Sequence, residues 1–195
     1  MGYSSSLING WRMKNPGKLF EDAIKKSIPD YCLLIRLPDP PHSFEQRSDT
    51  RFAVKNPCDY ICFDSINSVL YALELKTTKG TSMSVEFEGQ KDGTSKMIKR
   101  HQVKALTKMS KFDNVVSGLI LNFRDEFKSE ERTYFMFISD FNNMMSEINK
   151  KSCNEKDIMQ YGGIVIKGIK KRVNYQWDID GFFKSIDDIK FSLKL

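Results

Sequence analysis

The stretch from Asp59 to Lys76 constrains the fold of this chain more than any other part of the sequence. Residues 60–63 are apolar, residues 64–68 are suited to a turn, and residues 69–75 are apolar again apart from one glutamate. Two apolar runs joined by a short polar link are typical of a β-hairpin. The sequence therefore predicts two paired strands in the first half of the chain.

Side chains point alternately to the two faces of a strand. On the second strand, Glu74 and Lys76 therefore share one face, whereas the opposite face is apolar and consists of Tyr71, Leu73 and Leu75. A carboxylate and an ammonium group thus protrude side by side from a mostly buried strand. Asp59 lies near the start of the strand that pairs with it.

Two carboxylates and a lysine on adjacent strands can hold a divalent cation against a phosphate. Mg²⁺ takes hard oxygen ligands, and one or two carboxylates with waters and a phosphate suffice. The cation can lower the pKa of a bound water and polarise a phosphoryl oxygen. A lysine beside it can orient the attacking water. The same residues would also suit a surface hairpin that carries an ordinary ion pair.

The chain as a whole is basic. Its 195 residues carry a formal net charge of +6, which favours a polyanionic partner. This length predicts a single domain spanning residues 1–195. No apolar run approaches the ~20 residues that a membrane span needs, and we see no secretory signal. The four cysteines lack a metal-binding spacing and fit free thiols in a reducing compartment, so we expect a cytoplasmic protein without membrane contact.

Residues 96–112 are predicted to form an amphipathic helix with a basic face. Five cations follow one another at spacings of four, four, four and three, joined by Lys99: Lys96, Arg100, Lys104, Lys108 and Lys111. The segment contains no acidic residue, so these charges repel each other, and a DNA backbone would relieve the repulsion. A solvated lysine face is the alternative. Gln102 could reach the active centre from the start of this helix, or be an ordinary surface glutamine.

The other segments can be assigned more briefly. We expect helices at residues 18–27, 141–149 and 179–189, and strands at residues 32–37, 115–123, 133–138, 164–166 and 173–177. Residues 38–57 read as a loop that contains Arg51. This loop could project toward DNA, pack on the surface or conceal a short strand at residues 51–54. Residues 77–95 read as a second loop, in which Lys79 could meet a phosphate or be solvated.

The hairpin residues resemble the PD-(D/E)XK nuclease signature, with Asp59 followed by Glu74-Leu75-Lys76 and with Pro57-Cys58-Asp59 as a displaced form of its Pro-Asp half. Within that superfamily the chain is similar to RecU-type Holliday junction resolvases. The similarity rests on residues 17–21 (Gly-Lys-Leu-Phe-Glu), 58–60 (Cys-Asp-Tyr), 73–77 (Leu-Glu-Leu-Lys-Thr) and 101–102 (His-Gln).

This resemblance implies a restriction-endonuclease-like α/β core, a mixed central β-sheet flanked by helices. It also implies that Asp59 and Glu74 ligate Mg²⁺, for which Mn²⁺ can substitute, and that Glu21 assists through the metal or its waters. Without the resemblance, Glu21 would read as a solvated helix glutamate. Lys76 would position the nucleophilic water, and Gln102 would support the site.

The resemblance further implies a homodimer with two sites that nick opposed strands of a four-way DNA junction, in DNA recombination and repair. Residues 38–57 occupy the place of the family's projecting stalk but match no family motif. A divergent bacterial or phage-encoded member would fit. Two other functions stay open: a sequence-specific restriction or repair endonuclease of the same fold, and a non-catalytic DNA-binding or structural protein. The expected DNA contacts are Arg51, Lys79, Lys96, Lys99, Arg100, Lys104 and Lys108.

Overall fold

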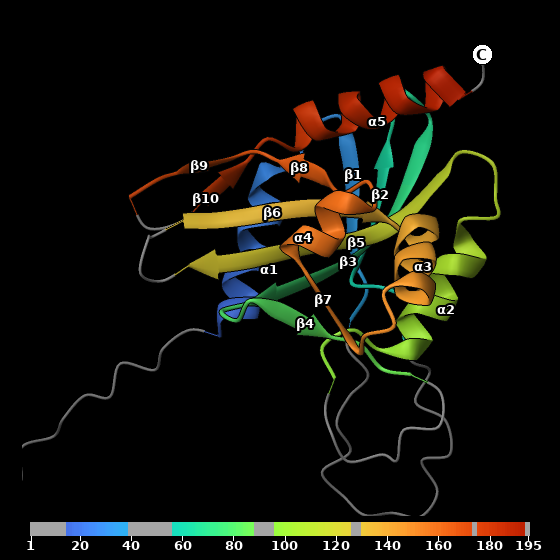
Figure 1. The fold of residues 1–195 in the computed structure, drawn as a ribbon. Helices are drawn as coiled ribbons and strands as arrows, with labels where there is room; N and C mark the ends of the chain where they lie inside the picture. The colour runs from blue at the N-terminus through green and yellow to red at the C-terminus, as the bar shows by residue number, and fades with distance from the viewer. Residues whose placement is uncertain (1–14, 39–55, 88–95, 126–129, 173–174, 194–195) are drawn as a thin grey trace, which may run out of the picture.

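The computed structural model describes residues 15–38, 56–87, 96–125, 130–172 and 175–193 (Figure 1). Its centre is a six-stranded sheet in the order β1-β2-β3-β5-β6-β8. The strands are β1 (Cys32–Arg36), β2 (Tyr60–Asp64), β3 (Val69–Thr78), β5 (Val115–Asp125), β6 (Glu130–Phe137) and β8 (Ile164–Ile166). The predicted α/β class, a mixed central sheet flanked by helices, is confirmed.

The predicted hairpin is present as β2 and β3. The two strands pair antiparallel, with Tyr60 opposite Leu73 and Asp64 opposite Val69, and β1 continues the sheet on the outer side of β2. On its other side β3 pairs with β5 in parallel. Parallel neighbours need a crossover connection, which here includes α2 (Arg100–Met109). This crossover brings α2 against the middle strands of the sheet, where it contacts β3 and β5.

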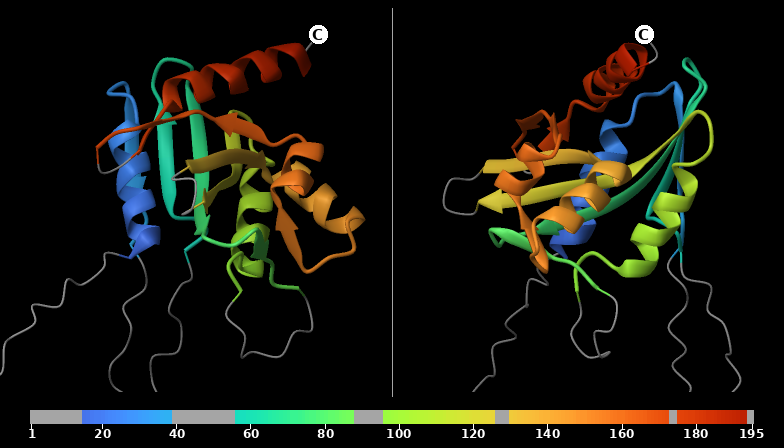
Figure 2. Two further views of the ribbon diagram at one scale, coloured as in Figure 1. Left: turned by 60° about the vertical axis from the view of Figure 1, so that its left-hand side comes forward. Right: turned by 45° about the vertical axis from the view of Figure 1, so that its right-hand side comes forward.

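Helices cover both faces of the sheet (Figure 2). Helices α1 (Pro16–Ser27) and α5 (Ile179–Leu193) contribute to one apolar core, in which Tyr71 stacks on Phe183 with ring centroids 4.1 Å apart. The second core lies on the opposite face, beneath α2, α3 (Ile138–Glu147) and α4 (Glu155–Gln160). Tyr71, Leu73 and Leu75 belong to the first core, as their alternation predicts, and Glu74 and Lys76 occupy the alternate positions of the strand.

Helix α1 begins two residues earlier than predicted, because Asn15 and Pro16 start it. The Asn15 side chain accepts a hydrogen bond from the Gly17 N–H at 2.9 Å, and Pro16 occupies the first helical position, where its missing N–H costs nothing. Phe20, Ala23 and Ile24 form its buried stripe. Helix α1 therefore presents the opposite edge of its surface, including Lys18 and Glu21, away from the core.

Three predictions about the middle of the chain differ from the structure. Residues 77–95 are not a continuous loop, because β3 extends to Thr78 and β4 (Ser82–Ser84) pairs with the distant β7 (Ser152–Asn154). The basic helix begins at Arg100 rather than at residue 96. Ile98 forms a parallel bridge with Val85, and this extended pairing delays entry into the helix. The helix predicted at residues 141–149 also starts earlier, at Ile138.

The C-terminal part adds a small second sheet. Strands β9 (Gly168–Lys170) and β10 (Tyr175–Trp177) form an antiparallel pair beside α1 (Figure 1). The strand predicted at residues 173–177 corresponds to β10, and β9 was not predicted. Most of the predicted loop at residues 38–57, including Arg51, lies outside the described residues. None of the helices in the described ranges is both long enough and apolar enough to span a lipid bilayer.

Candidate active site

Glu74 lies in the middle of β3, and its side chain is completely buried. Its Oε1 accepts hydrogen bonds from Lys76 Nζ and from Gln102 Nε2, the latter at 2.5 Å. Its Oε2 is buried and has no hydrogen-bond partner. A buried carboxylate oxygen without a partner is costly, because nothing replaces the hydration that it loses. Such an atom is a natural ligand position for a cation.

Asp59 lies next to Glu74 and is held by the backbone of β3. Its Oδ2 accepts a hydrogen bond from the Leu75 N–H at 2.8 Å, and its own N–H donates to the Leu73 carbonyl at 3.2 Å. Strand β2 begins only at Tyr60, so beyond the end of the backbone ladder the Asp59 carboxylate accepts the hydrogen bond from β3. The hairpin register therefore fixes the carboxylate of Asp59 relative to that of Glu74.

The electrostatics of this pair follow from burial. Loss of solvent raises the pKa of Glu74 to about 7; the nearby Asp59 carboxyl adds to the rise and the Lys76 ammonium opposes it. Burial also raises the pKa of Asp59, against the lowering effect of the Leu75 N–H and of Lys76. Each carboxyl group thus shifts the pKa of the other, which means that the two groups are close in space. Their charges would repel unless a cation or a proton lay between them.

Gln102 connects helix α2 to this pair with a defined orientation. Its Oε1 accepts a hydrogen bond from the Lys99 N–H at 3.2 Å, so its Nε2 is directed at Glu74. The carboxylate of Glu86 accepts from the Arg100 N–H at 3.0 Å and satisfies another free donor at the start of α2. The first turn of α2 is thereby fixed, and with it the amide that holds Glu74.

Glu86 was not predicted as part of this region, because it lies in the segment that was read as a loop. One signal could have pointed to such a residue. The position before α2 is Lys99, which has no side-chain oxygen, so the first N–H groups of the helix need an acceptor from elsewhere. The sequence alone does not say which residue supplies it.

Glu21 points toward cations rather than toward the carboxylate pair. Its Oε2 lies 3.3 Å from Arg36 Nε and 3.6 Å from Lys18 Nζ. Its negative charge nevertheless contributes to the raised pKa of Asp59. Within the described ranges, no three His, Cys, Asp or Glu side chains gather into a group that could bind a metal. The participation of Glu21 in a metal site stays a prediction.

The predicted DNA contacts fall into two groups by exposure. Lys79, Lys104 and Lys108 are exposed, whereas the cations around the start of α2 are half-buried: Lys96, Lys99 and Arg100. Lys111 follows the helix and is exposed. Helix α2 thus presents a shorter basic face to solvent than the sequence predicted, because its first turn packs against β3 and the segment after β4.

The chain was compared with family models, with curated proteins and with solved structures. No family model matches the chain. The SPbeta prophage-derived uncharacterized protein YotM of Bacillus subtilis (strain 168) is 29% identical over 175 residues, which cover 84% of this chain and 82% of YotM. Among solved structures, Hjc from Archaeoglobus fulgidus, a Holliday junction resolvase, aligns over 76% of this chain and 93% of its own. Its identity is 13% and its TM-score 0.44, a likeness too low to assign a fold family or an activity.

Proposed function

We propose that this protein is a metal-dependent DNA endonuclease that cuts branched DNA, with four-way junctions as its main substrate. The observation that carries the proposal is the buried carboxylate of Glu74, one oxygen of which has no partner, with the half-buried Asp59 carboxylate and the Lys76 ammonium beside it. A protein that only binds DNA gains nothing from two adjacent carboxylates, because they repel phosphate.

The donor set fits a hard divalent cation. Two carboxylates with free coordination positions are what Mg²⁺ or Mn²⁺ requires when waters and a phosphate complete the shell. The unpaired Oε2 of Glu74 supplies a ligand atom that burial has already desolvated. When bound, the cation would polarise the scissile phosphate and lower the pKa of the attacking water.

The residues of the chain have distinct roles in this proposal. Asp59 and Glu74 bind the cation from two adjacent strands. Lys76 donates hydrogen bonds to the attacking water or to a phosphate oxygen, because its ammonium already lies at the edge of the pair. Gln102 holds the Glu74 carboxylate in one orientation through Nε2. Water attacks phosphorus and the P–O bond to the leaving strand breaks. The leaving oxygen takes up the proton that the water loses, and the charge that develops on phosphate faces Lys76.

The choice of branched DNA, of a homodimer and of a restriction-endonuclease-like core rests on the resemblance to RecU-type resolvases. The exposed cations Lys104 and Lys108 of α2 support a DNA partner, because a phosphate backbone relieves their mutual repulsion. The similarity to a prophage-derived protein supports a phage-encoded enzyme that acts in the bacterial cytoplasm.

A substrate panel tests the proposal. Labelled four-way junctions, flaps and linear duplexes are incubated with Mg²⁺, Mn²⁺ or chelator, and the products are separated on denaturing gels. We expect paired nicks in the junction with either metal and no cleavage with chelator. Cleavage of linear duplex at a fixed sequence would instead identify the protein as a restriction or repair endonuclease. Failure to cut any substrate with either metal would refute the nuclease function.

A further inference from the structure

The pair of strands β9 and β10 carries a run of cations that the candidate site does not use. We propose that this basic hairpin, defined as Lys170 on β9 together with Lys167, Lys171 and Arg172 directly beside that strand, is a second DNA-contacting surface. It binds the phosphate backbone of the same DNA molecule that occupies the active site. The inference therefore rests on the proposed function. All four side chains are exposed.

The hairpin is fixed firmly to α1 through Trp177. The indole is 3% exposed, stacks on Tyr175 with centroids 5.2 Å apart and meets Phe20 edge-on at 5.9 Å. The backbone N–H of Trp177 donates to Ser27 Oγ at 2.9 Å. Gly168 lies so close to the indole that a Cβ would come within 2.5 Å of the ring. The backbone that carries the cations is therefore held against α1, so binding does not have to order the strand itself.

A series of contacts connects this hairpin to the candidate active site. Thr77, next to Lys76, accepts a hydrogen bond from Arg124 Nε at 3.0 Å. Arg124 in turn lines a hollow of about 80 Å³ together with Tyr175 of β10 and Pro16 at the start of α1. In β9, Lys170 is paired with Tyr175. The hairpin thus lies at the same side of the molecule as the end of β3 that follows the site, within reach of one DNA arm.

The positive charge of the basic hairpin also suits a polyanionic partner. Residues 167–172 carry four cations and no carboxylate. Lys170 interacts electrostatically with the neighbouring Glu131, which is half-buried and accepts a hydrogen bond from Asn122. Asp178 at the base accepts a hydrogen bond from the Gly181 N–H. The repulsion between like charges that lie close together on the surface falls when a phosphate backbone replaces their counterions.

The test is the salt dependence of DNA binding by the full chain. The variant Lys170→Gln/Lys171→Gln/Arg172→Gln is compared with wild type by fluorescence anisotropy, on a labelled duplex and a four-way junction, with chelator and a series of NaCl concentrations. Each phosphate contact contributes about 0.9 to the slope of log K against log salt. We expect the slope to fall by about two to three and the affinity at 0.1 M salt to fall at least about tenfold.

The matched control is Lys184→Gln on α5, an exposed lysine whose ammonium lies 2.7 Å from Asp180. It should leave the slope unchanged. As a measurement independent of substitution, lysine acetylation read by mass spectrometry should show that DNA protects Lys170 and Lys171 but leaves Lys184 reactive. If the protein binds and cuts DNA, but the triple variant keeps the wild-type slope and DNA does not protect Lys170 and Lys171, this inference alone is overturned. A wild-type protein that binds no DNA overturns it together with the proposed function.

Discussion

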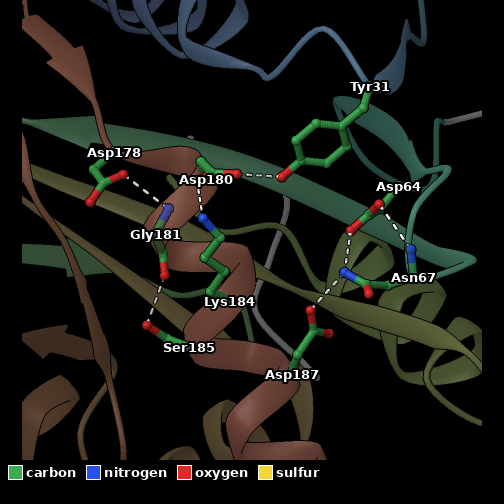
Figure 3. A network of polar contacts seen from close by, with 9 residues as sticks. All are labelled: Tyr31, Asp64, Asn67, Asp178, Asp180, Gly181, Lys184, Ser185 and Asp187. Carbon is green, nitrogen blue, oxygen red and sulfur yellow. Dashed lines mark hydrogen bonds and ion pairs between the residues drawn. The ribbon is translucent and has the colours of Figure 1, made fainter.

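Two carboxylates, Asp64 and Glu74, are completely buried in the same hairpin, and they differ in how their oxygens are satisfied. Asp64 ends β2 and directs both oxygens into the turn. Its Oδ1 accepts from the Ile66 N–H group at 2.8 Å. Its Oδ1 also accepts from the Asn67 N–H group at 3.2 Å, and its Oδ2 accepts from Asn67 Nδ2 at 3.0 Å (Figure 3). This carboxylate is saturated by neighbours in sequence and serves the turn.

Glu74 has the opposite arrangement. Both of its donors, Lys76 and Gln102, converge on Oε1, and Oε2 has none. The partners of Asp64 are backbone and amide groups close in the chain, whereas Gln102 comes from a helix after the hairpin. The comparison teaches that burial alone does not mark a functional carboxylate. The feature that sets Glu74 apart, and on which the proposed function rests, is an oxygen without a donor beside a second carboxylate.

The largest expected effect comes from removing the carboxylates that we propose as metal ligands. Asp59→Ala and Glu74→Ala should each lower the rate of metal-dependent DNA cleavage at least ~100-fold, because each removes a carboxylate from the charge arrangement that acts on the scissile phosphate. Single-turnover cleavage of labelled junction DNA measures the rate. Binding of the same DNA, measured with chelator, should persist.

Asp64→Ala is the matched comparison for those two variants. It should destabilise the fold by about 1–3 kcal/mol, because it leaves the turn N–H groups without their acceptor. The folded fraction should retain metal-dependent cleavage. If Asp64→Ala abolished cleavage in fully folded protein, the contrast between the two buried carboxylates would be mistaken.

A second prediction concerns the stability of the metal-free protein against pH. In the folded state the pKa of Glu74 is about 7, above its ordinary value of 4.5, so between these values the folded state holds a proton that the unfolded state has released. Linkage then requires stability to fall as pH rises from 4.5 to 7 and to stay level above that range. The loss amounts to about 3 kcal/mol, at 1.36 kcal/mol per pKa unit.

Glu74→Gln should abolish this dependence. At pH 8 with chelator, the variant should therefore be more stable than wild type by an amount on the order of 3 kcal/mol, and the difference should vanish near pH 4.5. Urea denaturation at several pH values measures it. Addition of Mn²⁺ should reverse the order, because only wild type has both ligands. Equal stability of the two proteins at pH 8 would contradict the raised pKa.

The smallest effect is expected at Gln102. Gln102→Ala removes one donor to Glu74 and should lower the cleavage rate by about 10–100-fold, through poorer orientation of the ligand. Gln102→Glu keeps the oxygen that accepts from the Lys99 N–H but places a carboxylate against Glu74, so it should be the worse of the two at pH 8. A pH–rate profile separates them. Identical profiles would mean that the amide has no directed role.

The hairpin could be predicted because its information is local. Alternating apolar residues define β2 and β3, and the same alternation assigns Glu74 and Lys76 to one face. Four of the residues that the sequence assigned from resemblance lie together in the structure: Asp59, Glu74, Lys76 and Gln102.

What the sequence could not reveal depends on contacts between distant segments. Strands β4 and β7 have three residues each, too few to show a period, and their paired residues Met83 and Cys153 are 70 positions apart in the chain. The bridge between Val85 and Ile98 shifts the start of α2 for the same reason. The pairing of Glu21 with Arg36 joins a helix to a strand end, which no spacing in the sequence indicates.

The position of Trp177 gives the molecule a built-in optical reporter. The chain has two tryptophans, and Trp11 lies outside the described residues, so a Trp11→Phe variant would isolate the emission of the buried indole. That indole sits between α1, which carries Glu21, and the strand pair that carries the lysines. A change in its emission on mixing with DNA would time the docking of one arm before any phosphodiester is cut.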